Sequence, residues 1–353
     1  MDYIPDVQVA RPGVSEEEWF DLRGDDERWY FLKSWYPTEA NAPEKLSKPK
    51  GAVVFVHGFG EHISRYTNIF KVFADRDYQV TGFDQRGYGR TWRDANDRDA
   101  VHGWTTWPDQ FRDVSHLLWL IRKRLDDDWG KDTVPIFLMG HSMGGGISTG
   151  FFTRPPGEGP GEEVKDLVSG VVLSAPWLDI HFPIPTSVGV ALMGVLLRIA
   201  PRLRLPLGPP SDDLCRDPLV CRAVREDPLC DTGVYTRGLY DPLRHGPKLV
   251  SEGYKRWPQR LPILVAHGTG DKVTKWSCSR DLVDNLKKRG CDATFASFNG
   301  NYHENLFEPG AIKIKFANSI IEYVAHLALT SSWMDNVIAR RKVHAIESQT
   351  VPH

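Results

Sequence analysis

The feature that most constrains this chain is the stretch 135–146, which reads Pro-Ile-Phe-Leu-Met-Gly-His-Ser-Met-Gly-Gly-Gly. A short apolar run ends there in a Gly-x-Ser-x-Gly pattern, which is typical of a strand, a sharp turn and a helix. Glycines are needed on both sides of the serine because the strand and the helix pack closely. This turn would hold the Ser142 hydroxyl at the carboxyl end of a sheet. Ser142 is therefore a candidate nucleophile, although the pattern alone fits a glycine-rich structural turn equally well.

Short apolar runs alternate with helical patterns along most of the chain. The runs predict buried strands at residues 53–56, 80–83, 134–139, 171–174, 262–266 and 293–298. Apolar residues at helical spacing predict helices at about 63–73, 107–125, 276–288 and 311–329. This alternation indicates an α/β fold with a mainly parallel central sheet and helices on both faces. Near the amino terminus, two aromatic-rich segments flank Arg23-Gly24-Asp25-Asp26 and predict a β-hairpin.

The alternation is interrupted between residues 176 and 257. This proline-rich stretch predicts a mostly helical cap inserted after the sixth strand. Three Asp-Pro-Leu sequences within it, beginning at Asp217, Asp227 and Asp241, predict the starts of three short helices. The expected division of the chain is a core in two parts, a cap and a polar tail, with boundaries at 1–175, 176–257, 258–329 and 330–353.

A serine nucleophile needs a base that takes its proton and an acid that orients the base. Asp271 follows one predicted strand in the sequence His-Gly-Thr-Gly-Asp, and His303 follows the next strand. Both would lie at the carboxyl ends of strands, where they can meet Ser142. Three residues in this order after three separate strands are much harder to obtain by chance than a single motif, so they predict a catalytic triad.

Acyl transfer also requires hydrogen-bond donors for the developing oxyanion. The backbone N–H groups of Met143, directly after the candidate nucleophile, and of Phe59, in the loop after residues 53–56, are placed to supply them. Rival signatures are weak, because the chain has no H-E-x-x-H sequence, Walker A loop or Rossmann fingerprint. The glycines at 144–146 could cradle a phosphate, but they lie inside the expected helix start. We therefore expect no metal and no cofactor.

Charge, cysteine content and the lengths of apolar runs indicate which partners and which cell compartment to expect. A formal charge of −2 gives no general reason to expect a nucleic-acid partner. Five cysteines without a C-x-x-C pair, and an amino terminus without the features of a signal peptide, favour a reducing, cytoplasmic environment. No apolar run reaches the roughly 18 to 20 residues that span a bilayer. The longest, 188–197, is followed by Arg198, Arg202 and Arg204.

Taken together, these residues resemble the α/β-hydrolases, and among them the monoacylglycerol lipases. The matching segments are His57-Gly58-Phe59-Gly60-Glu61-His62 with Arg65-Tyr66, then Gly140-His141-Ser142-Met143-Gly144-Gly145, His267-Gly268-Thr269-Gly270-Asp271, Tyr302-His303, and the cap segment at 217–223. The Gly-x-Ser-x-Gly turn is common to the whole superfamily, whereas the first segment is more specific to the monoglyceride lipase and lysophospholipase group. The resemblance covers roughly residues 17–328.

The resemblance implies hydrolysis of a monoacylglycerol to glycerol and a fatty acid. Ser142, Asp271 and His303 would form the triad, with Phe59 and Met143 as oxyanion donors. A lysophospholipase or a broader carboxylesterase is the alternative within the same chemistry, and a non-catalytic binding module is a remote one. The insertion near 90–107, the length of 222–257 and the extra tail depart from the family pattern and affect the expected substrate range.

The cap run 188–197 is apolar on all sides, unlike an ordinary surface helix. We expect this part of the cap to line an acyl tunnel, through Leu192, Val195 and Leu196 of the run and Ile199 just after it, and to contact a membrane or lipid-droplet surface. The alternative is a helix buried between cap and core. Glu61 and Arg65 could contact the glycerol end of a substrate, although pairing with each other is the favoured interpretation. Oligomeric state is not predicted.

Overall fold

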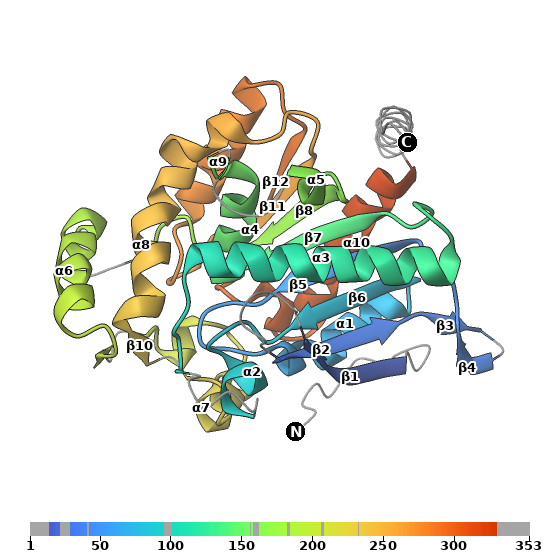
Figure 1. Cartoon of the computed structure of the whole chain (residues 1–353), viewed down its shortest axis with the longest axis horizontal. Helices are drawn as coiled ribbons and strands as arrows, with labels where there is room; N and C mark the ends of the chain where they lie inside the picture. Colours follow the sequence, from blue (N-terminus) through green and yellow to red (C-terminus); the bar gives the residue numbers. More distant parts are fainter. Residues whose placement is uncertain are drawn as a thin grey trace, which may run out of the picture.

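The centre of the molecule is an eight-stranded sheet (Figure 1). The computed structural model describes residues 14–21, 29–40, 42–94, 101–155, 157, 162–181, 184–205, 208–231 and 233–329. The sheet strands are β1 (Val14–Asp21), β2 (Trp29–Tyr36), β5 (Gly51–Val56), β6 (Tyr78–Phe83), β7 (Ile136–His141), β8 (Val168–Ser174), β11 (Ile263–Gly268) and β12 (Ala293–Phe298). Their order across the sheet is β1-β2-β6-β5-β7-β8-β11-β12.

The pairing of these strands confirms the expected mainly parallel sheet. Strands β6, β5, β7, β8, β11 and β12 pair in parallel, whereas β2 is antiparallel to both β1 and β6. Strands β1 and β2 form the expected hairpin, but its turn at 23–26 lies outside the described residues. This topology puts the carboxyl ends of β5, β7, β11 and β12 at one edge of the sheet.

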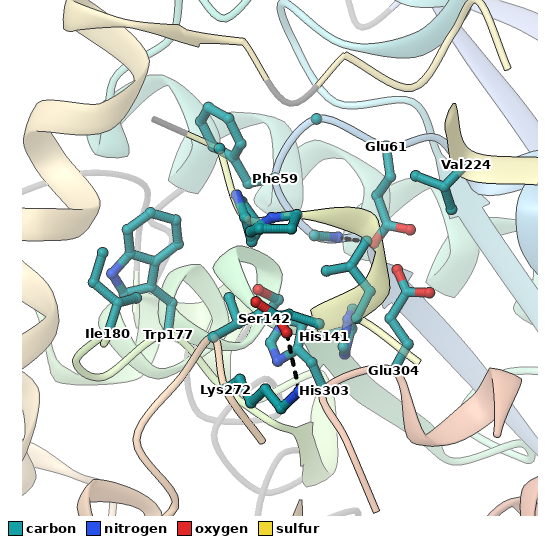
Figure 2. A pocket seen from close by; sticks show the side chains of 18 of the residues that line it. Phe59, Glu61, His141, Ser142, Trp177, Ile180, Val224, Lys272, His303 and Glu304 are labelled. Atoms are coloured by element: carbon teal, nitrogen blue, oxygen red, sulfur yellow. Dashed lines mark hydrogen bonds and ion pairs between the residues drawn. The ribbon is translucent and has the colours of Figure 1, made fainter. Parts of the chain in front are cut away.

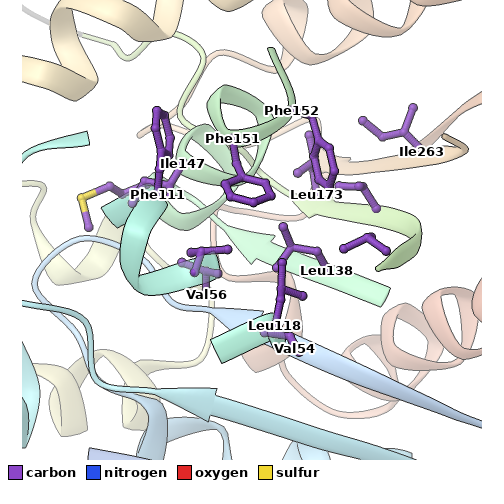
Figure 3. Packing of buried hydrophobic residues seen from close by; sticks show 14 of the residues in the cluster. Val54, Val56, Phe111, Leu118, Leu138, Ile147, Phe151, Phe152, Leu173 and Ile263 are labelled. Carbon is purple, nitrogen blue, oxygen red and sulfur yellow. The ribbon is translucent and has the colours of Figure 1, made fainter. Parts of the chain in front are cut away.

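Helices cover both faces of the sheet because side chains of each strand alternate between the faces. In β5, Val54 and Val56 join one buried cluster, and Val53 and Phe55 join the other. The first cluster, part of which Figure 3 shows, packs against α3 (Trp107–Trp129), α4 (Met143–Thr153), α8 (Thr236–Ser251) and α9 (Trp276–Lys288). The second packs against α1 (Thr67–Ala74) and α10 (Ala311–Leu329).

The structure confirms the helices expected in the core, with some shifts at their ends. Helix α3 begins as its sequence predicts, because Thr106 caps it by accepting a hydrogen bond from the backbone N–H of Asp109 (3.2 Å) and Pro108 occupies the first turn. The first predicted helix is split into a 3₁₀ turn at Ile63–Tyr66 and α1. The smaller elements are β3 (Thr38–Glu39), β4 (Ala42–Leu46), α2 (Gly89–Arg93) and α5 (Glu162–Lys165).

Between β8 and β11 the chain forms a mostly helical cap at one end of the sheet (Figure 1). It contains α6 (Thr186–Ile199), β9 (Arg204–Leu205), α7 (Pro218–Glu226), β10 (Val234–Tyr235) and α8. Because β8 is the sixth strand of the large sheet along the chain, the cap lies where the sequence places it. Within the described part of the chain, every helix is too short or too polar to cross a bilayer.

One of the three predicted helix starts in the cap is confirmed and two are wrong. Asp217 caps α7, and its carboxylate accepts a hydrogen bond from the Leu219 N–H (3.0 Å). Asp227 instead opens a turn between α7 and β10. Asp241 lies inside α8, where its carboxylate accepts a hydrogen bond from the backbone N–H of Trp107 (2.9 Å), the first residue of α3. Contacts with the core therefore override the local helix-start signal.

Candidate active site

Ser142 lies in a strained turn between β7 and α4. Its backbone adopts φ 51° and ψ −117°, a conformation that few residues other than glycine occupy. The turn is fixed by two backbone hydrogen bonds, from Ser142 N–H to the Ser174 carbonyl (3.0 Å) and from Trp177 N–H to the Ser142 carbonyl (2.7 Å). Both partners lie at or beyond the end of β8, so the neighbouring strand holds the serine at the edge of the sheet.

The glycines around Ser142 are required by close packing. A Cβ atom on Gly140 would lie 2.4 Å from the carbonyl oxygen of Gly144. On Gly144 it would lie 2.1 Å from the carbonyl oxygen of Val56, in the adjacent strand. Neither contact can be relieved by rotating a side chain, because both involve backbone atoms. This confirms the steric argument for glycines at the turn.

Replacing Gly144 by alanine should therefore destabilise the fold, by about 3 kcal/mol, the upper end of the usual overpacking cost. Thermal unfolding followed by circular dichroism would measure the change. Gly194→Ala in α6 is the matched control, because its new methyl group would meet only the Tyr240 ring at 3.5 Å and alanine favours helix. A Gly144→Ala protein as stable as the Gly194→Ala protein would contradict the packing argument.

Asp271 and His303 are held together in the loops after β11 and β12. The Nδ1 atom of His303 lies 2.8 Å from Asp271 Oδ2, which also accepts hydrogen bonds from His267 Nε2 (2.9 Å) and from the Thr274 hydroxyl (2.9 Å). The other carboxylate oxygen accepts backbone N–H groups of Val273 and Thr274, at 2.7 and 2.9 Å. The carboxylate is thus oriented by five donors. Because it binds Nδ1 of His303, Nε2 is the ring nitrogen that is left to accept a proton.

Electrostatics in this cluster favour a charged aspartate beside a basic histidine. Burial opposes ionisation of Asp271, but His303 and His267 outweigh it and hold the pKa of that carboxyl well below its usual range. Burial likewise opposes protonation of His303, but the Asp271 carboxylate outweighs it and raises the pKa of His303 above its ordinary value. This combination makes His303 a stronger base than a free imidazole and gives the resulting imidazolium a counter-charge.

His141, the residue before Ser142, lies beside this pair without competing for the proton. Its ring centre is 4.8 Å from that of His303, and its Nδ1 is 3.1 Å from the Ser174 carbonyl oxygen. Burial, helped by the neighbouring His303, lowers the pKa of His141 to about 3. His141 is therefore neutral at physiological pH and adds no positive charge next to the serine.

The loop after β5 carries Phe59 and is fixed by Glu61. The Oε1 atom of Glu61 accepts hydrogen bonds from the Gly58 N–H and from the Tyr66 hydroxyl (2.8 Å). Met143 is the first residue of α4, so its N–H has no carbonyl one turn earlier in the helix. The sheet edge therefore carries both backbone segments that the sequence suggests as oxyanion donors.

Arg65 forms a buried ion-pair network between two carboxylates. It contacts Glu61 and makes a two-pronged pair with Glu304, with both nitrogen–oxygen distances 2.8 Å. The pairing of Glu61 with Arg65 that the sequence favours is thus present. Burial opposes ionisation of Glu61, but Arg65 and its neighbours outweigh it and lower the pKa of this carboxyl. The network ties the Phe59 loop to the residue that follows His303.

Replacing Glu61 by alanine should lower kcat by about 100-fold, a little less than the loss of one whole oxyanion donor. The Gly58 N–H would lose its acceptor, and the Phe59 loop would lose its fixed position. Steady-state kinetics should show a smaller change in KM, and Glu61→Gln should recover part of kcat because its amide oxygen can still accept. Glu17→Gln, at an exposed glutamate that pairs with the buried Lys33, is the control. If Glu61→Ala, Glu61→Gln and Glu17→Gln all had the wild-type rate, Glu61 would not position the Phe59 loop for catalysis.

Ser142 and His303 line a cavity of about 360 Å³ between core and cap (Figure 2). One part of the wall is apolar and another carries the charged network, as the labelled side chains in Figure 2 show. The apolar lining includes Phe59, Trp177, Ile180, Leu214, Val224 and Leu239. The polar lining includes Glu61, Arg65, His181, Asp213, Lys272 and Glu304. A cavity of this size and composition suits a small amphipathic molecule.

The four α6 residues expected in an acyl tunnel do not line this cavity. Leu192, Val195 and Ile199 are 52, 55 and 73% exposed, and Leu196 is partly buried against the first core cluster. Helix α6 packs on α8 instead of over the site, and only Gly189 and Met193 of this helix are buried. The expectation that α6 lies against the substrate is therefore corrected: Leu192, Val195 and Ile199 face solvent on the outside of the cap, and Leu196 packs toward the core.

The site contains further residues that the sequence does not predict. Thr274 and His267 share the Asp271 carboxylate, and Glu304 completes the Arg65 network. His267 lies in a segment that carries the family resemblance and Glu304 directly follows another, which is a signal of their position but not of their partners. Thr274 has no such signal, because a threonine three residues after an acid is common.

Comparisons with known proteins agree with this fold. A family model described as serine aminopeptidase, S33, matches residues 47–310. The monoacylglycerol lipase of Mycolicibacterium smegmatis is 31% identical over 266 residues, covering 74% of this chain and 84% of that protein. A putative monoglyceride lipase of Schizosaccharomyces pombe is 28% identical, and the match covers 86% of this chain and 70% of that protein. Among solved structures, a soluble variant of Saccharomyces cerevisiae monoglyceride lipase in complex with a substrate analogue superposes with a TM-score of 0.75. The two chains are 21% identical, and the match covers 94% of this chain and 100% of that one.

The fold and the matching family model place this chain among the serine hydrolases of the α/β-hydrolase fold. More narrowly, it belongs to the S33 family, in its monoglyceride lipase-like branch.

Proposed function

We propose that this chain hydrolyses monoacylglycerol to glycerol and a free fatty acid. His303 takes the proton of the Ser142 hydroxyl as that oxygen attacks the ester carbonyl. The oxyanion accepts hydrogen bonds from the backbone N–H groups of Phe59 and Met143, and Asp271 stabilises the imidazolium. The imidazolium then protonates the departing glycerol oxygen. Water, deprotonated by His303, releases the fatty acid from the acyl-enzyme and restores the serine.

The charge arrangement in the cavity supports a neutral head group. Lys272 and Arg65 are the permanently charged cations among the described lining residues, and each is already paired with carboxylates. Lys272 Nζ lies 3.1 Å from Asp213 Oδ1, and Arg65 lies between Glu61 and Glu304. A phosphate group would meet these carboxylates without a spare cation, whereas glycerol hydroxyls can donate hydrogen bonds to them. This observation favours monoacylglycerol over a lysophospholipid.

A substrate panel tests the proposal. Purified protein should release fatty acid from a monoolein emulsion with a kcat/KM at least about tenfold above that for oleoyl lysophosphatidylcholine, a difference of about 1.4 kcal/mol. A short-chain ester of a simple alcohol separates the broad carboxylesterase alternative. Faster turnover of the lysophospholipid, or equal turnover of all three esters, would replace the proposed substrate with one of these alternatives.

We also propose that the protein binds reversibly to a lipid surface through α6. The exposed side chains Val188, Leu192, Val195 and Ile199 form an apolar face on this helix. Residues 186–204 contain arginines and no acidic residue, and although Arg204 pairs with Asp231, Arg198 adds positive charge in the last turn of the helix. Apolar side chains next to basic ones suit insertion at a membrane or lipid-droplet surface. This placement would bring the cap, and with it the cavity, close to water-insoluble substrate.

Flotation with liposomes containing anionic lipid measures this association. The double variant Leu192→Asp and Ile199→Asp should lose most of the floating fraction, because it puts two charges on the inserted face. Leu46→Asp is the matched control, because this exposed leucine lies in β4, far from α6 in Figure 1. A wild-type protein that never floats, or a double variant that floats like wild type, would contradict the proposal.

A further inference from the structure

Three possible metal ligands converge where the cap meets the core. His62 follows the Phe59 loop, whereas Asp227 and Cys230 come from the turn after α7. Their ligand atoms all lie within 4.8 Å of one another, and His62 Nε2 is 2.9 Å from Asp227 Oδ2. The sequence separates the histidine from the aspartate by 165 positions, which explains why no spacing motif reveals the group.

The histidine of this group has an unused donor or acceptor. His62 is 5% exposed, and its Nδ1 is buried without a hydrogen-bond partner among the described residues. A buried polar atom in this state costs free energy, so the hydrogen bond with Asp227 leaves the ring only half satisfied. The Asp227 carboxylate is itself oriented, because its other oxygen accepts the Leu229 N–H (2.8 Å). Asp227 is therefore pre-positioned, and the His62 nitrogen that faces it is Nε2, so the ring would bind a metal through Nε2 while Nδ1 lies on the other side of the ring.

The surroundings of the group are electronegative and reachable. Glu61 and Glu304 lie nearby around Arg65, so with Asp227 three carboxylates face one guanidinium. Cys230 is free of any disulfide and lines the catalytic cavity. A small cation can therefore reach the thiol through the cavity, and the local charge favours its arrival.

We propose that His62, Asp227 and Cys230 bind a zinc ion. Nitrogen, oxygen and sulfur ligands in one group suit zinc better than calcium or magnesium, which prefer oxygen alone. On binding, the Cys230 thiol loses its proton to solvent and its sulfur bonds to the metal, so each zinc ion bound releases a proton. Three protein ligands leave the fourth tetrahedral position for water on the side of the cavity.

The ion would fasten the cap to the core beside the catalytic loop. The backbone N–H of Asp231 already donates to the Gly60 carbonyl (3.0 Å), so the turn at 227–231 touches the segment that carries Phe59. Zinc would add a second and stronger link between the same two segments. The expected consequence is a cap that opens less readily, so zinc acts as a stabiliser of the fold and as a brake on substrate passage.

Cobalt(II) provides a spectroscopic test that does not depend on activity. Titrating metal-free protein with cobalt should produce a near-ultraviolet thiolate-to-cobalt charge-transfer band that saturates at one ion per chain. Cys230→Ser should abolish the band, whereas Cys278→Ser, a partly buried cysteine on α9, should leave it intact. Absence of the band in the wild type, or its persistence in Cys230→Ser, would overturn the proposal.

Calorimetric titration with zinc tests the remaining ligands. Asp227→Asn and His62→Gln should each weaken zinc binding at least about 100-fold, since removing a ligand costs no less than removing a group that orients one. Wild-type protein should also unfold at a higher temperature with zinc than without it, and Cys230→Ser should lose this shift. Wild-type zinc affinity in both ligand variants would rule the site out even if one of them proved less stable.

Discussion

Replacing Ser142 by alanine is expected to lower kcat for fatty acid release by about 10⁶-fold. The acyl-enzyme cannot form without the hydroxyl, and what remains is the weak effect of binding and oxyanion donors on direct attack by water. The two hydrogen bonds that hold the turn involve only the backbone of residue 142, so the variant should keep its fold. Rates on monoolein, together with a thermal unfolding curve, measure both expectations.

Ser148→Ala is the matched control for this experiment. Ser148 is a fully buried serine of α4, and its hydroxyl has no hydrogen-bond partner among the described residues. Its loss should change kcat by no more than a few-fold. Wild-type activity in Ser142→Ala would refute the assignment of the nucleophile, and equal losses in both variants would mean that α4 packing rather than chemistry is responsible.

Replacing Asp271 by asparagine should lower kcat by about 10⁴-fold, as expected when the orienting acid of a triad becomes neutral. The asparagine amide would face the N–H and O–H donors that now converge on the carboxylate, so His303 would be held in the wrong tautomer. Asp284→Asn, at an exposed position on α9, should have no effect. Rates on the same substrate give the comparison directly.

The pH profile of the same variant separates electrostatics from misfolding. Neutral His303 is the active form, and Asp271 raises the pKa of this histidine above its ordinary 6.5. Wild-type activity should therefore be lost as the pH falls through a midpoint above 6.5. In Asp271→Asn the imidazolium loses its counter-charge, so the midpoint should move to lower pH. A midpoint that stays in place would contradict the link between the two residues.

The sequence predicts the core well because its signals are local. The apolar run at 53–56 has to be buried on both faces, and β5 lies at the centre of the sheet with its side chains divided between two clusters. The order of Ser142, Asp271 and His303 after three strands is likewise a local property of each strand end. Parallel strand topology then brings these ends together, and the pairing of His303 with Asp271 follows.

The cap is predicted less well because its conformation depends on contacts across the molecule. Asp241 looks like a helix start, but its carboxylate contacts the start of α3 more than a hundred residues earlier. An apolar run such as 188–197 fits both a tunnel wall and an outer surface, and only the packing of α6 on α8 shows that its apolar face is outward. The partners of Arg65 and His62 could not be found from spacing for the same reason.

The most direct test of the central claim is covalent labelling of the folded protein with a fluorophosphonate. A competent nucleophile beside a base should attack the phosphorus, and peptide mapping should find one adduct per chain, on Ser142. Ser142→Ala, Asp271→Asn and heat-unfolded protein should label little or not at all. No adduct on the folded wild-type protein, or an adduct confined to another serine, would contradict the account and favour a non-catalytic binding module with the same fold.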